Sequence, residues 1–236
     1  MAADRAMRAR VRAGAALIAL AGALAACDAP SANGPAFAYD PSLRYVDATG
    51  EHDFVYHWPL GSVVRVFVDD RAQPAGWDIV AAVDAGGKAW QSEMFYREVS
   101  LRRVASAADA DVVVHYDAAP ATVDLPADCG LPFVQAAGIT VLCPNADYSG
   151  LEVLPLAGST ATGHVKMDVT AVVSRIADDA QLRRVVAREV GHVFGIGAHS
   201  GNRDDLMFPV PQVDGPSPAD GQTLRWVLHQ SGAVAP

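Results

Sequence analysis

Residues 185–209 read VVAREVGHVFGIGAHSGNRDDLMFP, and this stretch decides both the fold and the candidate chemistry. At about 100° per residue, one helical face is formed by Leu182, Val185, Val186 and Val193. Glu189 falls in the middle of that apolar face, with positions 188 and 192 beside it. Burying a carboxylate on that face costs free energy unless a hydrogen bond or an opposite charge compensates it. Two interpretations remain open: a surface glutamate at the edge of the apolar face, or a general base beside a metal ion.

The rest of the chain predicts strands and helices in a mixed order. A helix is expected over 178–195, because Asp178 or Asp179 can cap its start and Gly195 and Gly197 can end it. Two further helices are expected over 77–91 and from 217 to 228. Strands are predicted over 63–68, 99–104, 111–116, 139–142 and 163–169. This order indicates an α+β domain built in layers.

Glu189, His192, Gly195, His199 and Met207 together resemble the metzincin zinc motif, HExxHxxGxxH followed by a methionine turn. In that motif two ligands one helical turn apart hold one zinc ion, and the glutamate activates the zinc-bound water. A glycine lets the chain turn, so that a third histidine reaches the metal. The resemblance implies that Glu189 is the general base, that His192 and His199 bind zinc, and that Met207 lies beneath the metal.

Within the metzincins the chain is similar to the matrixins. Residues 199–209 match the matrixin pattern of His-Ser, five variable residues and Leu-Met-aromatic-Pro. Residues 78–90, 108–116 and 217–228 are similar to the first helix, the Ala-Asp-Ile strand and the last helix of that family. The resemblance implies a twisted, mostly parallel sheet with about three helices, one zinc ion and a polypeptide substrate.

Two positions depart from the family. Arg188 stands where the first zinc ligand belongs, and a protonated guanidinium has no lone pair to give to a metal. His192 and His199 are seven residues apart, whereas the motif has six. One hypothesis is that Arg188 takes the place of the metal and pairs with Glu189 or another acid. The other keeps a weaker zinc site from Glu189, His192, His199 and water, or borrows His164 or His115.

The N-terminus predicts export. An arginine-rich start precedes an apolar run over 13–26, which is too short for a transmembrane helix. The run ends LAAC at residues 24–27 and resembles the lipobox of bacterial lipoproteins. That resemblance implies a signal peptide over 1–26 and a lipid on Cys27, which would hold the protein on the periplasmic or outer face of a membrane in the cell envelope. An ordinary secretory signal with a chance cysteine is the alternative.

Composition bounds the remaining possibilities. The chain has 236 residues, is 51% hydrophobic and carries a formal net charge of −9. A polyanion would be repelled, so nucleic acid is not an expected partner. We expect residues 27–58 to form a lipidated tether and residues 59–236 to form one monomeric domain.

Cys129 and Cys143 are a candidate disulfide with 13 residues between them (143 − 129 − 1), and two buried free thiols are the alternative. The stretch CGLP at 129–132 is similar to the matrixin propeptide switch but lies inside the domain, so we interpret it as part of this loop. No second metal or calcium site is assigned near His164.

Three functions remain open on the sequence. The first is a membrane-anchored matrixin-type metalloendopeptidase whose peptide-bond hydrolysis is lost or reduced by Arg188. The second is a pseudoprotease that binds a peptide or protein without cutting it. The third is a structural envelope lipoprotein with a vestigial cleft.

Overall fold

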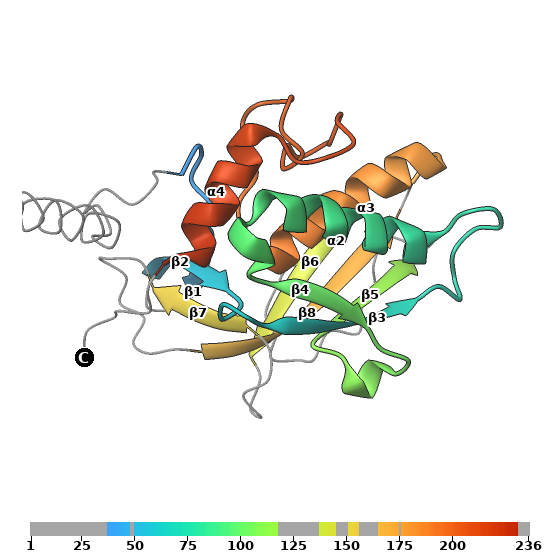
Figure 1. Ribbon diagram of the computed structural model, residues 1–236, viewed down its shortest axis with the longest axis horizontal. Helices are drawn as coiled ribbons and strands as arrows, with labels where there is room; N and C mark the ends of the chain where they lie inside the picture. Colours follow the sequence, from blue (N-terminus) through green and yellow to red (C-terminus); the bar gives the residue numbers. More distant parts are fainter. Residues whose placement is uncertain are drawn as a thin grey trace, which may run out of the picture. The chain divides into compact units, whose positions relative to one another are not determined.

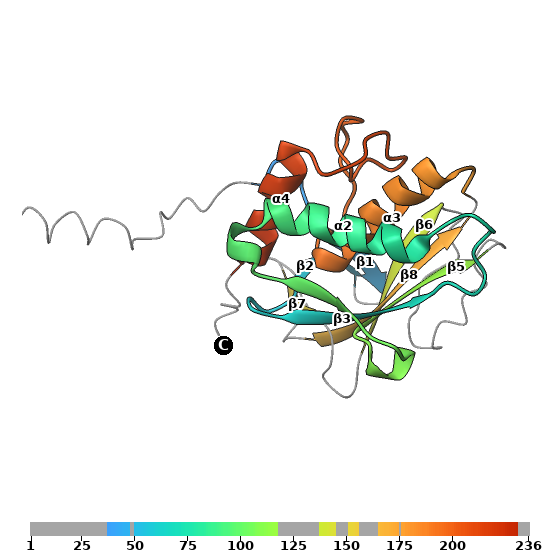
Figure 2. The ribbon, with the colours of Figure 1, turned by 45° about the vertical axis from the view of Figure 1, so that its right-hand side comes forward.

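The computed structural model describes residues 37–47, 50–117, 137–144, 151–155, 165–174 and 176–230. In these residues eight strands form one sheet, and three α-helices cover one of its faces (Figures 1 and 2). The chain therefore has the layered α+β architecture that the mixed order of elements predicts.

The sheet is mixed. Its strands are β1 (Leu43–Asp47), β2 (Gly50–His57), β3 (Val63–Asp69), β4 (Ser100–Arg103), β5 (Val112–Asp117), β6 (Gly138–Pro144), β7 (Leu151–Pro155) and β8 (Val165–Ser174). Their order is β1-β2-β7-β8-β5-β3-β4, and β6 pairs with β8 on the same side as β7.

The expected mostly parallel sheet describes only one half of this arrangement. Strands β4, β3, β5 and β8 are neighbours in parallel pairs. The other four pairs, β1–β2, β2–β7, β7–β8 and β6–β8, are antiparallel. Consecutive strands that a short turn joins pair antiparallel, and the parallel half needs the longer crossovers.

The folded unit begins earlier than the sequence predicts. The expected tether over 27–58 contains β1 and β2, which pair with each other and join the sheet through β7. β7 was also not predicted. Residues 28–58 as a whole have a loop-like composition that hides β1 and β2, although β2 itself contains the apolar run Phe54-Val55-Tyr56.

Each helix has a local start signal. α2 (Ile79–Glu93) is capped by Asp78, whose Oδ1 accepts the amide of Ala81 at 2.8 Å. α3 (Asp179–Phe194) is capped in the same way by Asp178. α4 (Pro218–Leu228) begins with a capping box of Ser217 and Asp220. Two short 3-10 helices, Phe95–Arg97 and Ala107–Asp109, flank β4, and no helix among the described residues is long and apolar enough to span a membrane.

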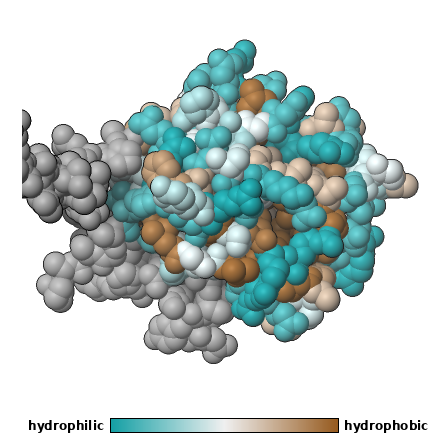
Figure 3. Space-filling model, viewed as in Figure 1, coloured by the Kyte–Doolittle hydropathy of each residue, from teal (hydrophilic) through white to brown (hydrophobic). Residues whose placement is uncertain are grey.

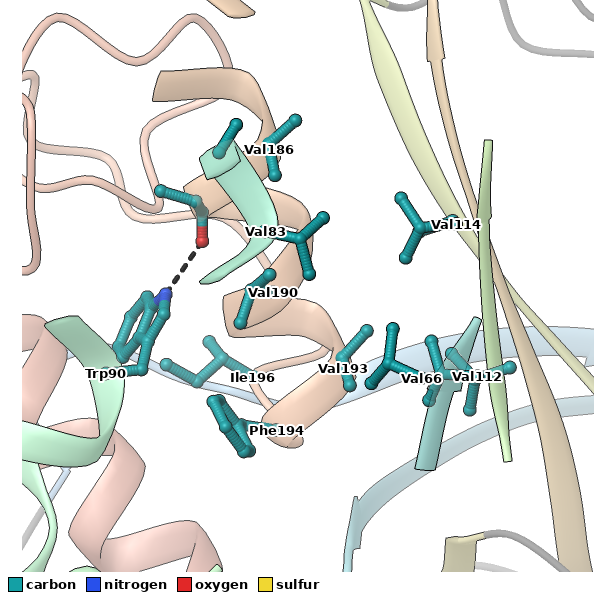
Figure 4. Close-up of a cluster of buried hydrophobic side chains, with 14 of the residues drawn as sticks. Val66, Val83, Trp90, Val112, Val114, Val186, Val190, Val193, Phe194 and Ile196 are labelled. Atoms are coloured by element: carbon teal, nitrogen blue, oxygen red, sulfur yellow. Dashed lines mark hydrogen bonds between the residues drawn. The ribbon is translucent and has the colours of Figure 1, made fainter. Parts of the chain in front are cut away.

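The core lies between the sheet and the pair α2 and α3. Figure 4 shows valines of β3 and β5 facing valines of α2 and α3, with Trp90 at the edge of the cluster. α2 and α3 approach closely, because a Cβ on Gly86 would lie 3.0 Å from the Cα of Ala187. Trp90 Nε1 donates to the carbonyl of Ala187 at 2.7 Å, so the two helices are fixed against each other by contact and by a hydrogen bond.

Replacing Gly191 by alanine tests this packing. The new Cβ would lie 2.5 Å from both Met207 Sδ and Trp90 Cζ2, and both side chains are fully buried. Overpacking costs about 1–3 kcal/mol, which exceeds the helix propensity of about 1 kcal/mol that alanine gains over glycine. We expect a lower urea midpoint for Gly191→Ala. Gly201→Ala is the control, because nothing lies within 4 Å of its added Cβ; equal midpoints for the two variants would contradict the packing.

Candidate functional site

Helix α3 carries three of the predicted site residues in its C-terminal half. Arg188, Glu189 and His192 are all buried there. The helix ends at Gly195, whose φ of 119° lies in the left-handed region that glycine tolerates. A Cβ at this position would collide with the carbonyl oxygen of Tyr56. The turn sends the chain back, so that His199 meets His192.

Three aromatic side chains hold the carbonyl oxygens of this half of the helix. Trp90 Nε1 donates to Ala187 at 2.7 Å, as described above. The hydroxyl of Tyr56 donates to the carbonyl of His192, and Trp58 Nε1 donates to that of Val193, both at 2.8 Å. Carbonyls in the last turn of a helix need partners of this kind. The backbone beneath the site residues is therefore fixed by α2, by β2 and by the residue that follows β2.

Met207 lies under the same helix, where the methionine turn was predicted. Its side chain is fully buried against Gly191, and its carbonyl accepts the amide of Ser200 at 3.0 Å. The buried carboxylate of Asp220 accepts the amides of Leu206 at 2.7 Å and of Met207 at 3.4 Å. Asp220, which also closes the capping box of α4, thus positions the loop beneath α3.

His192 and His199 form a close pair of imidazoles. Their Nε2 atoms are 3.3 Å apart, and the rings meet edge to face at 70°. His192 Nδ1 lies 2.6 Å from the carbonyl oxygen of Ile196, which can only accept, so Nδ1 carries the proton and Nε2 keeps its lone pair.

Both rings are neutral near pH 7. Burial, and the positive charge of Arg188, lower the pKa of His192 against the opposing effect of Glu189. Desolvation, His192 and Arg188 lower the pKa of His199 to about 4. A neutral imidazole with a free lone pair is the form that binds a metal.

The spacing of the two Nε2 atoms fits a metal, but the donor set is incomplete. Two Zn–N bonds of about 2.0–2.1 Å at a tetrahedral angle place their nitrogens about 3.3–3.4 Å apart. His192 and His199 match this separation. Catalytic zinc takes three protein ligands, and the part of the chain that the structure describes contains no group of three His, Cys, Asp or Glu residues that could hold a metal.

Arg188 forms a buried ion pair with its neighbour Glu189, as one of the two hypotheses for this arginine predicted. Its Nη2 and Nε lie 2.5 and 3.1 Å from Glu189 Oε1, and the two side chains are only 5% and 2% exposed. The second oxygen, Oε2, accepts the hydroxyl of Thr140 at 2.7 Å. Both oxygens of Glu189 are therefore engaged by the protein.

The same guanidinium joins two segments on either side of α3. Nη2 donates to the carbonyl of Gly138 in β6 at 3.1 Å, and Nη1 donates to the carbonyl of Pro209, just beyond Met207. With the bonds to Glu189, Arg188 uses donors on all three of its nitrogens. A buried guanidinium needs partners of this kind.

The register of β6 shows which of its edges Arg188 occupies. Ser174 donates to the carbonyl of Ala137 at 2.8 Å, so residue 137 turns its backbone groups toward β8. Backbone groups alternate in direction along a strand, and Gly138 therefore turns its carbonyl away from β8. Arg188 binds at this outer edge, where a further strand would have to pair.

The ion pair sets the protonation of Glu189. Burial alone would raise the pKa of its carboxyl, but the charge of Arg188 and the hydrogen bonds from Arg188 and Thr140 outweigh it and lower the pKa. Glu189 is thus an ionised, doubly bound carboxylate. A general base works best with a pKa near the working pH, so this environment makes Glu189 a weak one.

The structure brings together five predicted residues: Arg188, Glu189, His192, His199 and Met207. Cys27, Cys129 and His164 lie outside the described residues, and so does the candidate disulfide of Cys129 with Cys143. His115 lies in β5, where burial lowers its pKa and the charges of Asp117 and Asp69 oppose that shift.

Three contributors to the site were not predicted: Gly138, Thr140 and Pro209. Gly138 lies 50 residues before Arg188 and Thr140 lies 49 before Glu189 in the chain, and Pro209 contributes only its carbonyl. A carbonyl acceptor leaves no signal in a sequence, because every residue carries one.

No protein-family model and no curated protein matches this sequence. The interpretation of the site therefore depends on its motif and on the geometry described above.

Arg188→Ala is the sharpest test of the ion pair. It leaves the buried carboxylate of Glu189 without its partner, which costs about 3–5 kcal/mol. Arg183→Ala is the matched control on the same helix, because Arg183 pairs with Asp179 on the exposed surface, where such pairs contribute about 0–1 kcal/mol. Urea unfolding of both variants measures the difference; a loss for Arg188→Ala no larger than that for Arg183→Ala would contradict the structural role of this pair.

Proposed function

We propose that this chain is a lipid-anchored protein of the bacterial cell envelope with a matrixin-like domain that has lost peptide-bond hydrolysis. The observation that carries the loss of activity is the guanidinium of Arg188, which binds Glu189, Gly138 and Pro209 at once. The anchoring part of the proposal is supported by the lipobox-like residues that end at Cys27.

The matrixin assignment is supported by the order and the placement of the motif residues. Glu189 and His192 follow one another on the helix, a left-handed glycine ends it, and His199 returns to His192. Met207 then packs under the helix against Gly191. A layered α+β domain with three helices is also what the resemblance implies.

The loss of hydrolysis follows from what the residues can still do. His192 and His199 would hold zinc, which as a bound ion would polarise a carbonyl and activate water. Arg188 offers no lone pair as a third ligand, and its fixed charge beside the pair of histidines repels a cation. Glu189, with both oxygens engaged, is a poor acceptor for the proton of an attacking water.

The pseudoprotease alternative faces a specific obstacle. An extended peptide binds a sheet by pairing with the backbone of an unpaired edge. Arg188 already occupies the carbonyl of Gly138 at the outer edge of β6 and reaches across to Pro209. A peptide at this position would have to displace a buried, bonded guanidinium, so we favour a domain that neither cuts nor captures peptides at this edge.

A weakly active zinc enzyme is the second candidate, and one observation favours it. The 3.3 Å between the Nε2 atoms of His192 and His199 suits two ligands of one tetrahedral ion. In that case water would complete the coordination in place of Arg188.

Zinc content and peptide hydrolysis of the detergent-purified full chain separate the two candidates. We expect the natural chain to bind far less than one zinc per molecule and to cleave no peptide. Arg188→His restores the missing ligand and frees Glu189, so we expect this variant to bind about one zinc per chain. Weak hydrolysis by this variant would show that the rest of the site is intact.

The double variant Arg188→His with Glu189→Gln is the matched control, since it should bind zinc without hydrolysis. If the natural chain binds one zinc per molecule and cleaves peptides, the loss of hydrolysis is contradicted and the weakly active zinc enzyme is favoured.

A further inference from the structure

Four large apolar side chains stay exposed around the C-terminal end of α4. They are Phe37, Leu60, Phe95 and Tyr96, which we call the aromatic face. Tyr96 is 99% exposed. Single exposed apolar residues are ordinary on a protein surface, but several of them close together indicate an interaction surface.

Contacts through α4 and Glu98 link Phe37, Phe95 and the turn at Leu60 to one end of α4, and Tyr96 directly follows Phe95 in the chain. Phe37 packs edge-on against Trp226 of α4 at 4.9 Å between ring centroids. One turn along α4, the ring of His229 lies 5.6 Å from that of Phe95. His229 also bonds to the side chain of Glu98, whose carbonyl accepts the amide of Gly61, next to Leu60.

The face of the molecule in Figure 3, which includes α4, shows hydrophobic residues set among hydrophilic ones. Arg97 is exposed beside Tyr96, and the guanidinium of Arg225 lies 5.4 Å over the ring of Phe95. An apolar group with polar and cationic neighbours suits a boundary between water and an apolar phase.

The backbone holds Tyr96 outward at a cost. Tyr96 and Arg97 have φ values of 56° and 55°, and they are the only non-glycine residues with positive φ in the described part of the chain. Such conformations cost of order 1–3 kcal/mol each and persist where the surroundings impose them. Here the strain presents a fully exposed aromatic ring, which brings no packing in return.

The described part of the domain begins at this face. Phe37 belongs to the face and lies ten residues after Cys27 (37 − 27). A chain of ten residues spans at most about 35 Å when it is fully extended. If Cys27 carries lipid, a connection of this length keeps the aromatic face within reach of the membrane.

We infer that the aromatic face rests on the lipid bilayer, with Phe95 and Tyr96 among the headgroups. The inference rests on the proposed lipidation of Cys27, because the acyl chains supply the affinity and the face sets the orientation of the domain. Tyrosine favours this depth, since its ring is apolar and its hydroxyl can stay hydrated. The net charge of −9 opposes electrostatic attraction to anionic lipids, so the contact is through the rings.

Photo-crosslinking in the full, membrane-bound chain tests the inference. A benzophenone analogue of phenylalanine replaces Tyr96 in one variant and Val210 in the other. Val210 is also exposed but follows the methionine-turn loop outside the aromatic face, which makes it the matched control. Both variants are reconstituted in vesicles of phosphatidylethanolamine and phosphatidylglycerol, and mass spectrometry reads Cys27 acylation separately from the crosslinks.

We expect several-fold more lipid adduct from position 96 than from position 210, unchanged by raised salt. Equal or absent lipid adducts on an acylated chain would overturn the docking and leave the anchoring proposal intact. In native membranes, an adduct of position 96 with another protein would overturn it in favour of a protein partner. If mass spectrometry finds no lipid on Cys27, both the anchoring proposal and this inference are contradicted.

Discussion

The buried pair of Arg188 and Glu189 is the constraint on which the site depends. A guanidinium and a carboxylate that water barely reaches must find all their partners in the protein, since each uncompensated charge would cost several kcal/mol. Arg188 meets this demand with Glu189 and with carbonyls of β6 and of the loop after Met207. The pair therefore holds three segments together: α3, β6 and the loop after Met207.

This arrangement needs a rigid support, and the support resembles what a catalytic site would require. Trp90, Tyr56 and Trp58 hold the carbonyls of α3, and Asp220 fixes the loop that brings Met207 under the helix. The arginine at position 188 decides the chemistry of the site without contributing to this support. A fixed cation can supply by hydrogen bonds part of the cohesion that a metal supplies by coordination.

Sequence reasoning succeeded where the signal is local. The helix predicted over 178–195 is α3 within one residue at each end, because its apolar period and its caps lie within the helix itself. Strands β1, β2 and β7 were missed, because short strands in stretches of loop-like composition become recognisable only beside the partners that pair with them. The matrixin resemblance and the lipid anchor remain predictions.

By itself the sequence determined that one helix carries Arg188, Glu189 and His192, and that Arg188 cannot bind a metal. Residue type and helical period are enough for both statements. Only the tertiary structure decided that the guanidinium reaches Gly138, 50 residues away in the chain, and the carbonyl of Pro209, 21 residues away. Such partners depend on how the crossovers place β6 and the loop beside α3, and backbone carbonyls look the same at every position in a sequence.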